Sequence, residues 1–362
     1  APSITDIKED LKFLNAAGFR VLRTYHARLY EHTPRLLQAI REMKEADPNF
    51  EMYVMLGTWM QCENAFTAQA NHAKADTLNN KAEITQAVAL AQKYPEIVKV
   101  IAVGNESMVH WAATYFVEPG IILRWVAHLQ DLKKAGSLDK NLWITSSDNF
   151  ASWGGGDTTY HVPDLEALIR AVDYISMHTY PMHDTHYNPE FWGVDAAEEE
   201  LEAIAQIEQA MLRARDYAVA QYEGVVGYLQ QLGIDKPVHI GETGWATYSN
   251  ALYGAEGSRA CDEYKAGRYF QLMREWTNSQ GIACFYFEAF DEPGKAAGNP
   301  GGSENHFGLF TVDGKAKYAL WELVEAGVFD GLSRAGRSIE ASYDGSLDAL
   351  LEEVRIPPLR VN

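Results

Sequence analysis

Two glutamates stand at the ends of apolar segments. Residues 98–103 (VKVIAV) lead into VGNE, which places Asn105 and Glu106 at the end of that segment. Residues 237–240 (PVHI) lead into GETGW, which places Glu242 at the end of another. A carboxylate in apolar surroundings is costly without a partner, and its alternative role is a buried ion pair that holds a loop. Two such glutamates on separate segments favour catalysis.

Two carboxylates that face each other across a cleft can cleave a glycosidic bond. One protonates the leaving oxygen, while the other attacks the anomeric carbon or activates a water molecule. A separation of roughly 5–5.5 Å gives retention through a covalent glycosyl-enzyme, and a larger one gives inversion. The residues by themselves leave the stereochemistry open.

Short segments rich in β-branched and aromatic residues alternate with helical patterns such as residues 33–46 and 82–94. This alternation is typical of repeated β-α units around a parallel sheet. It predicts an α/β protein with a (β/α)8 TIM barrel, in which side chains at the carboxyl ends of the strands form the active site. The predicted strands are residues 19–25, 50–56, 98–103, 142–146, 172–177, 237–240 and 283–287.

These strands are one short of a closed barrel, because the chain opens on a helical pattern. Ser3 or Thr5 can cap that helix and Gly18 can end it. We expect the first barrel strand to be missing upstream of Ala1; the alternative is that residues 337–343 fill the place, with an unusual order of connections. We expect a single catalytic domain over residues 1–362, with 322–362 as a C-terminal extension that packs on the barrel.

The other predicted strand ends supply polar and aromatic side chains for a substrate. Tyr180 can donate a hydrogen bond to Glu242, and Glu292 and Lys295 can pair with each other while binding sugar hydroxyls. Tryptophans offer flat faces for sugar rings; Trp153 is the first candidate, with Trp192 and Trp245 as others, although Trp245 could equally be a packing residue behind the site. The full set of expected substrate-binding residues is Tyr25, Trp59, Asn105, Asp148, Trp153, Tyr180, Trp245, Phe290, Glu292, Lys295 and Glu304.

The composition narrows the partners. A net charge of -19 disfavours nucleic acid and anionic membranes, which bind basic patches. The three cysteines have no C-x-x-C spacing, and the histidines in HTYPMHDTH fit no common zinc pattern. We therefore expect a neutral carbohydrate partner and neither a metal nor another cofactor.

The ordered series VGNE, HTYP, GETGW, FEAFDEPGK and SENHFGLF resembles glycoside hydrolase family 17, the β-1,3-glucanase family of a retaining clan, in its microbial form. The resemblance covers about residues 19–321. It implies that Glu106 is the proton donor, Glu242 the nucleophile and Asn105 a contact to the 2-hydroxyl, with Glu292, Lys295 and Glu304 as supporting polar residues. One departure is T-G-W-A after the nucleophile, where the plant enzymes have S-G-W-P.

The resemblance implies a retaining endo-β-1,3-glucanase of the laminarinase type. We expect a monomer that is secreted or periplasmic, or held at the cell surface, with β-glucan polysaccharide or oligosaccharide as its partner. One alternative is a β-1,3-glucanosyltransferase on the same site. Another, of a different class, is a non-catalytic glucan-binding barrel.

Overall fold

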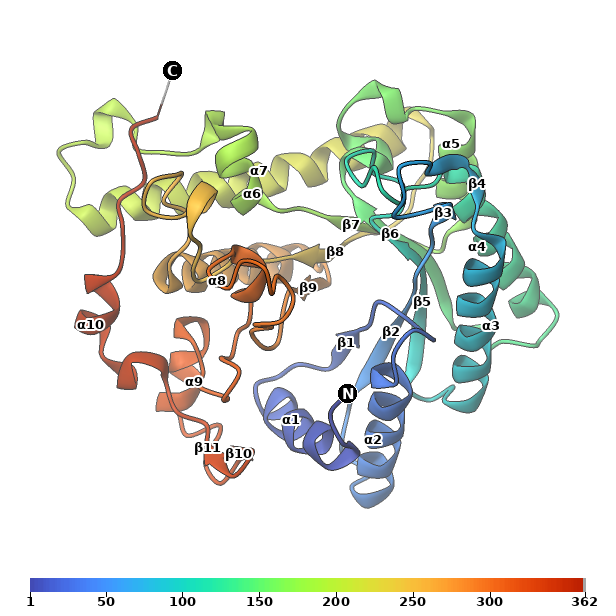
Figure 1. The fold of residues 1–362 in the computed structure, drawn as a ribbon, viewed down its shortest axis with the longest axis horizontal. Coiled ribbons are helices and arrows are strands. Elements are labelled where there is room, and N and C mark those ends of the chain that lie inside the picture. Colours follow the sequence, from blue (N-terminus) through green and yellow to red (C-terminus); the bar gives the residue numbers. More distant parts are fainter. Residues whose placement is uncertain (361–362) are drawn as a thin grey trace. The chain divides into compact units, whose positions relative to one another are not determined.

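The computed structural model describes residues 1–360 of the 362. Its main sheet has seven strands in the order β1-β2-β5-β6-β7-β8-β9 (Figure 1). The register is parallel from β1 to β7. The strands are β1 (Val21–Arg23), β2 (Tyr53–Thr58), β5 (Val98–Asn105), β6 (Trp143–Asn149), β7 (Ile175–His178), β8 (Val238–Thr243) and β9 (Cys284–Tyr286).

Helices separate these strands along the chain. The order and alternation are those of a (β/α)8 barrel, as predicted, and the described residues supply seven of its strands. The helices are α1 (Ile4–Ala16), α2 (His32–Ala46), α3 (Thr77–Lys93), α4 (Pro119–Lys134), α5 (Pro163–Ala171), α6 (Pro181–Tyr187), α7 (Ala203–Gln231), α8 (Glu263–Gln280), α9 (Trp321–Glu325) and α10 (Leu347–Glu352).

The helix at the start of the chain forms for the predicted reason. Ser3 caps α1 because its hydroxyl oxygen accepts from the Asp6 N–H, and the Asp6 carboxylate accepts from the Ser3 N–H in return. Gly18 follows with a φ of 97°, a conformation that glycine adopts without strain.

The alternative eighth strand is excluded. Residues 337–338 form β11 (Arg337–Ser338), which pairs antiparallel with β10 (Ser333–Arg334) in a separate two-stranded sheet. A second hairpin that the sequence did not predict joins β3 (Cys62–Glu63) to β4 (Asn71–Ala75).

Backbone contacts divide the chain into two compact units. Unit 1 comprises Ala1–His178 and Gln221–Gly241, and unit 2 comprises Thr179–Ala220 and Glu242–Asn362. Within unit 1, Val54, Met55 and Leu56 of β2 are fully buried. Such an unbroken apolar run is expected of a parallel strand that is covered on both faces.

Unit 2 has its own core, built largely from aromatic side chains that include Trp192, Trp245, Tyr269 and Phe307. The C-terminal segment contacts this unit. Trp321 Nε1 donates to Ser342 Oγ at 3.0 Å, and the backbone of Val194 bridges to Leu359. Residues 361–362 of the predicted extension lie outside the described residues.

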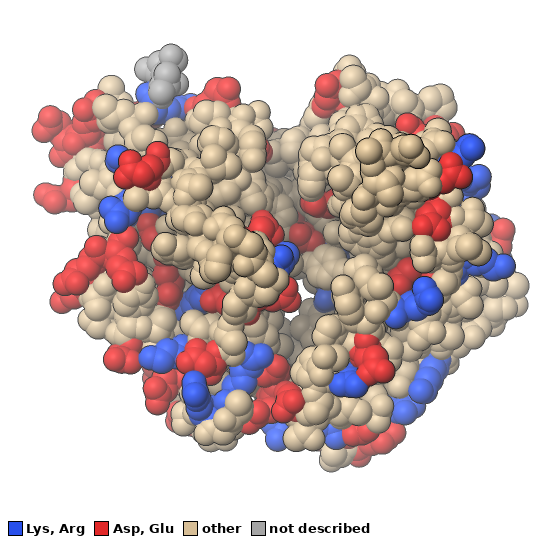
Figure 2. Space-filling view, viewed as in Figure 1, with Lys and Arg blue, Asp and Glu red and all other residues tan. Residues whose placement is uncertain are grey.

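The surface carries both signs of charge. On the face in Figure 2, Asp and Glu side chains are widely spread, with Lys and Arg among them. Among residues 1–360, no helix combines the length and apolar character that a bilayer crossing needs. The three cysteines are free thiols.

Candidate active site

In unit 1, Glu106 directly follows β5 in a backbone turn. Gly104 has a φ of 87° and Glu106 itself a φ of 46°, which is uncommon for a residue with a side chain. The Glu106 N–H donates to Ser147 O at 3.0 Å. The turn therefore places Glu106 at the carboxyl end of its strand and ties it to the neighbouring β6.

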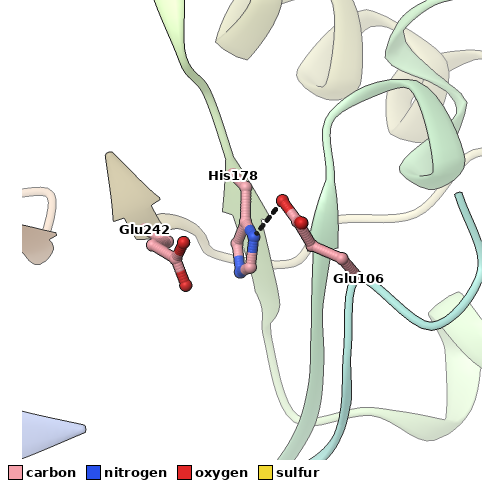
Figure 3. A group of neighbouring side chains, drawn as sticks. All are labelled: Glu106, His178 and Glu242. Carbon is pink, nitrogen blue, oxygen red and sulfur yellow. Dashed lines mark hydrogen bonds and ion pairs between the residues drawn. The ribbon is translucent and has the colours of Figure 1, made fainter. Parts of the chain in front are cut away.

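The Glu106 carboxylate has a fixed partner. His178, fully buried at the end of β7, places Nδ1 3.0 Å from Glu106 Oε1, and Figure 3 shows the two groups turned toward each other. On the other side of the ring, His178 Nε2 lies 2.7 Å from Ser147 Oγ. A neutral His178 that donates from Nδ1 accepts the Ser147 hydroxyl at Nε2, so this chain fixes both the ring and the carboxylate.

Asn105 is oriented by an arginine that sequence reasoning missed. Arg23 Nη2 donates to Asn105 Oδ1 at 2.6 Å, and its Nη1 donates to Gly241 O at 2.9 Å. With its carbonyl oxygen occupied, Asn105 is left with its NH2 group as a donor for another partner. A cation inside the run LRTY was the available signal, because an arginine within a barrel strand needs acceptors.

Asp148 is fully buried and accepts bonds from the Met108 backbone and Ser152 Oγ, each at 2.7 Å. Burial raises its pKa to about 6, against the lowering effect of those two bonds. The structure thus corrects its predicted contact to substrate: Asp148 joins the loops that follow β5 and β6.

Trp153 is also buried, contrary to its predicted role as a sugar platform. It has no exposed surface, and its Nε1 donates to Ser176 O at 3.0 Å. The turn Ala151–Gly155 that carries it packs closely, since a Cβ on Gly154 would lie 2.2 Å from the Tyr228 ring. The indole is therefore a core side chain.

Two predicted aromatic contacts of unit 1 keep partly exposed faces. The Arg23 guanidinium carbon lies over the Tyr25 ring, 4.6 Å from the centroid of that ring. Trp59 follows β2 and donates from Nε1 to Gln61 Oε1 at 3.0 Å. Both are placed after strand ends, as expected.

In unit 2, Glu242 sits near the end of β8 and is 8% exposed. Tyr180 Oη donates to Glu242 Oε1 at 2.6 Å, so the hydrogen bond suggested from the sequence is present. The Glu242 backbone oxygen accepts from Thr179 N at 3.1 Å. These bonds fix the carboxylate and supply it with a donor.

The segment after β9 gathers charged side chains within unit 2. Lys295 forms its ion pair with Glu304 at 3.2 Å, whereas the sequence suggested Glu292 as the partner. Burial raises the pKa of Glu288 to about 9, with Glu292 adding to the rise and Lys295 opposing it. Glu288, which the sequence did not single out, is therefore a neutral acid near pH 7.

The remaining aromatic candidates of unit 2, Trp245 and Phe290, differ in burial. Trp245 is 1% exposed and donates from Nε1 to Ala260 O at 2.9 Å, which favours packing over the alternative of a sugar platform. Phe290 is partly buried, with the Arg334 guanidinium 3.6 Å from its ring centroid. Trp245 would have to move before it could present a face to a sugar, whereas Phe290 keeps part of its surface exposed.

Two of the three histidines considered for a metal, His178 and His183, form hydrogen bonds. His178 contacts Glu106 and Ser147, as described above, and His183 Nδ1 lies 3.0 Å from Tyr253 Oη. Each of these contacts is a hydrogen bond within its own unit.

The chain is similar to known glycoside hydrolases in sequence and in structure. The model of the BtgE/BtgC glycoside hydrolase domain matches residues 2–308. The crystal structure of an endo-laminarinase from Formosa Hel1_33_131 is 61% identical, with a TM-score of 0.98 over 100% of this chain and 92% of that one. A glucan 1,3-beta-glucosidase from Arthroderma benhamiae is 27% identical, over 86% of this chain and 83% of its own.

A more distant structure shares the fold. The glycoside hydrolase family 17 β-1,3-glucanosyltransferase from Rhizomucor miehei is 19% identical, with a TM-score of 0.60 over 88% of this chain and 91% of its own.

Proposed function

The chain belongs to the family of the BtgE/BtgC glycoside hydrolase domain, and from this we propose that it is a retaining endo-β-1,3-glucanase of glycoside hydrolase family 17. The observation that supports β-1,3-glucan as the substrate is the 61% identity, over the whole chain, to an endo-laminarinase. In its mechanism, Glu106 serves as acid/base and Glu242 as nucleophile.

The environment of each carboxylate supports its role. Glu242 is nearly buried and accepts the Tyr180 hydroxyl, a donor that favours the ionised form a nucleophile needs. Glu106 is more accessible, with 14% of its side chain exposed, and is held by His178. Glu106 directly follows β5 and Glu242 lies one residue before the end of β8, and the carboxyl ends of strands carry the catalytic residues of barrel enzymes.

The reaction proceeds in two steps. Glu106 donates its proton to the glycosidic oxygen as the bond to the anomeric carbon breaks, and Glu242 forms a bond to that carbon. Glu106, now a carboxylate, takes a proton from water, whose oxygen attacks the anomeric carbon and releases Glu242. The product keeps the β configuration, and both glutamates return to their starting states.

The neighbouring polar residues are proposed to bind the sugar. The Asn105 NH2 group, oriented by Arg23, donates to the 2-hydroxyl. The Lys295–Glu304 pair and Glu292 offer donors and acceptors to other hydroxyls. We also propose that the enzyme is secreted or periplasmic, where it would meet a β-glucan polymer, and that it acts as a monomer.

The test is the product profile of a linear β-1,3-glucan oligosaccharide labelled at its reducing end, followed by mass spectrometry beside a β-1,4 control. Shorter products from internal cleavage of the β-1,3 chain alone are expected, with loss of activity in Glu242→Gln. Products longer than the substrate would make the protein a glucanosyltransferase. Binding without turnover would make it a glucan-binding barrel.

A further inference from the structure

A row of aromatic rings in unit 1 takes no part in the mechanism above. The Trp59 ring stacks on His26, with centroids 5.1 Å apart and planes 17° from parallel. The Trp59 ring also neighbours two others. Its centroid lies 6.5 Å from that of Phe66, with the ring planes 19° from parallel, and 4.9 Å from that of Tyr115. We call these four residues, His26, Trp59, Phe66 and Tyr115, the aromatic platform.

Phe66 is hard to explain by packing. It is 60% exposed at the tip of the β3–β4 hairpin, and its φ of 62° lies in the left-handed region that a bulky side chain rarely adopts. A bond from Phe66 N to Thr114 O, 2.7 Å long, holds this conformation. A strained backbone that displays an aromatic ring to solvent points to function, because core burial does not compensate for it.

The loops that carry the platform are joined by the carboxylate of Glu83. Glu83 of α3, 6% exposed, accepts from Ala27 N at 2.7 Å and from Trp59 N at 3.2 Å, which ties the loops after β1 and β2 together. Burial lowers the pKa of His26, with Glu83 opposing the shift, so the ring beneath Trp59 is neutral near pH 7. The face is therefore aromatic, preorganised and without a fixed charge of its own.

The platform adjoins the candidate site within unit 1. Thr58, the residue before Trp59, pairs in register with Val103, two residues before Asn105. Tyr115 belongs to the loop that follows Glu106 and leads to α4, and the backbone of Tyr115 accepts from Cys62 N at 3.1 Å. The rings thus come from the loops of β1, β2 and β5, the last of which positions Glu106.

We propose that the aromatic platform is a remote subsite that binds glucosyl residues of the β-1,3-glucan chain away from the cleaved bond, with Phe66 and Trp59 stacking on sugar rings. The proposal rests on the proposed function. The C–H faces of glucose pack on flat aromatic rings, and a neutral platform suits an uncharged polymer. Such a subsite favours long chains over short ones.

The test compares Phe66→Ala with wild type on β-1,3-linked oligosaccharides of increasing length. The kcat/KM for long chains is expected to fall roughly 3- to 10-fold, the usual effect of an aromatic contact, with little change for the shortest cleaved chain. Phe66→Trp keeps a stacking face and should restore the preference for long chains. Leu78→Ala, at an 84% exposed position on α3, is the matched control and should change nothing.

If Phe66→Ala lowers kcat/KM equally for every oligosaccharide length, or for none, the proposal that the aromatic platform is a remote subsite is refuted. Calorimetric binding of the same oligosaccharides to Glu242→Gln, with and without Phe66→Ala, separates this proposal from the proposed function. Phe66-dependent binding without cleavage by the wild type would leave the platform standing and refute the glucanase. Cleavage by the wild type, with no effect of Phe66→Ala on either kinetics or binding, would support the glucanase and refute the platform.

Discussion

Tyr180 Oη donates a 2.6 Å hydrogen bond to Glu242 Oε1, and both side chains belong to the same compact unit. The nucleophile proposed here is therefore oriented by a donor from the residue pair that follows β7. Glu106 is held in the same manner by His178, the last residue of β7. One short segment, His178 to Tyr180, supports both carboxylates.

Replacing Tyr180 with Phe removes the donor while it keeps the ring. A hydrogen bond to a charged group contributes about 1.5–3 kcal/mol, so we expect kcat/KM on laminarin to fall by roughly 10- to 100-fold. Steady-state kinetics on the purified variant measure this. Tyr187→Phe, at a 63% exposed position on α6, is the control; equal losses in the two variants would refute the assigned role.

Replacing His178 with Asn is expected to impair protonation of the leaving group, because His178 fixes the Glu106 carboxylate at 3.0 Å. We expect kcat on laminarin to fall about 10- to 100-fold, less than the roughly 100- to 10,000-fold contribution of a general acid–base residue, because His178 positions the acid and does not replace it. A 2,4-dinitrophenyl β-laminaribioside, whose weakly basic leaving group departs without a proton, should lose far less. If both substrates lose activity equally while the melting temperature is unchanged, His178 does not act through Glu106.

Glu288→Gln tests the raised pKa of that group. Its pKa is about 9 in the folded protein against a usual 4.5, so the unfolded chain releases the proton first as pH rises. The wild type should therefore lose stability relative to the variant between about pH 4.5 and 9, and the difference should then level off. Melting temperatures across this range measure the effect. Glu256→Gln, at an exposed position, should show no such trend; a constant difference for Glu288→Gln would contradict the prediction.

Asp291→Ala tests a buried ion pair of unit 2. Lys317 Nζ lies 2.6 Å from Asp291 Oδ1, with only 4% and 12% of the side chains exposed. Burial lowers the Lys317 pKa although Asp291 raises it, so removing Asp291 leaves a poorly solvated ammonium. We expect a loss of about 3–5 kcal/mol in unfolding free energy, seen as a lower denaturation midpoint. Adding Lys317→Met should recover part of it; a double variant less stable than the single would contradict this account.

The sequence predicted all seven strands of the sheet, because each combines an apolar run with turn signals. It also placed Glu106 and Glu242 at or near strand ends, where the structure has them, and suggested the Tyr180 hydrogen bond that is present. Burial was harder to predict: Trp153 and Trp245 have the residue type of a sugar platform, yet long-range packing buries both. Whether a tryptophan faces a core or a cleft depends on partners distant in sequence, such as Tyr228 beside Gly154.

Arg23 and the ion pair of Lys295 show the same limit for polar groups. From sequence alone, an arginine in a strand looks like a solvent-facing residue. The fold shows instead that Arg23 donates to Asn105 and to the Gly241 carbonyl. Lys295 has acidic neighbours nearer in sequence, such as Glu292, and only the fold selects Glu304. Residue type predicted the chemistry of these groups, whereas their pairing depends on tertiary structure.

The most direct test of the central claim is to trap the glycosyl-enzyme. The protein is incubated with a 2-deoxy-2-fluoro-β-laminaribioside that carries an activated leaving group, then digested and sequenced by mass spectrometry. The account predicts one added glycosyl group on the peptide that contains Glu242, and none in Glu242→Gln. A label on a different carboxylate, or turnover of glucan to the inverted α product with no label, would contradict it.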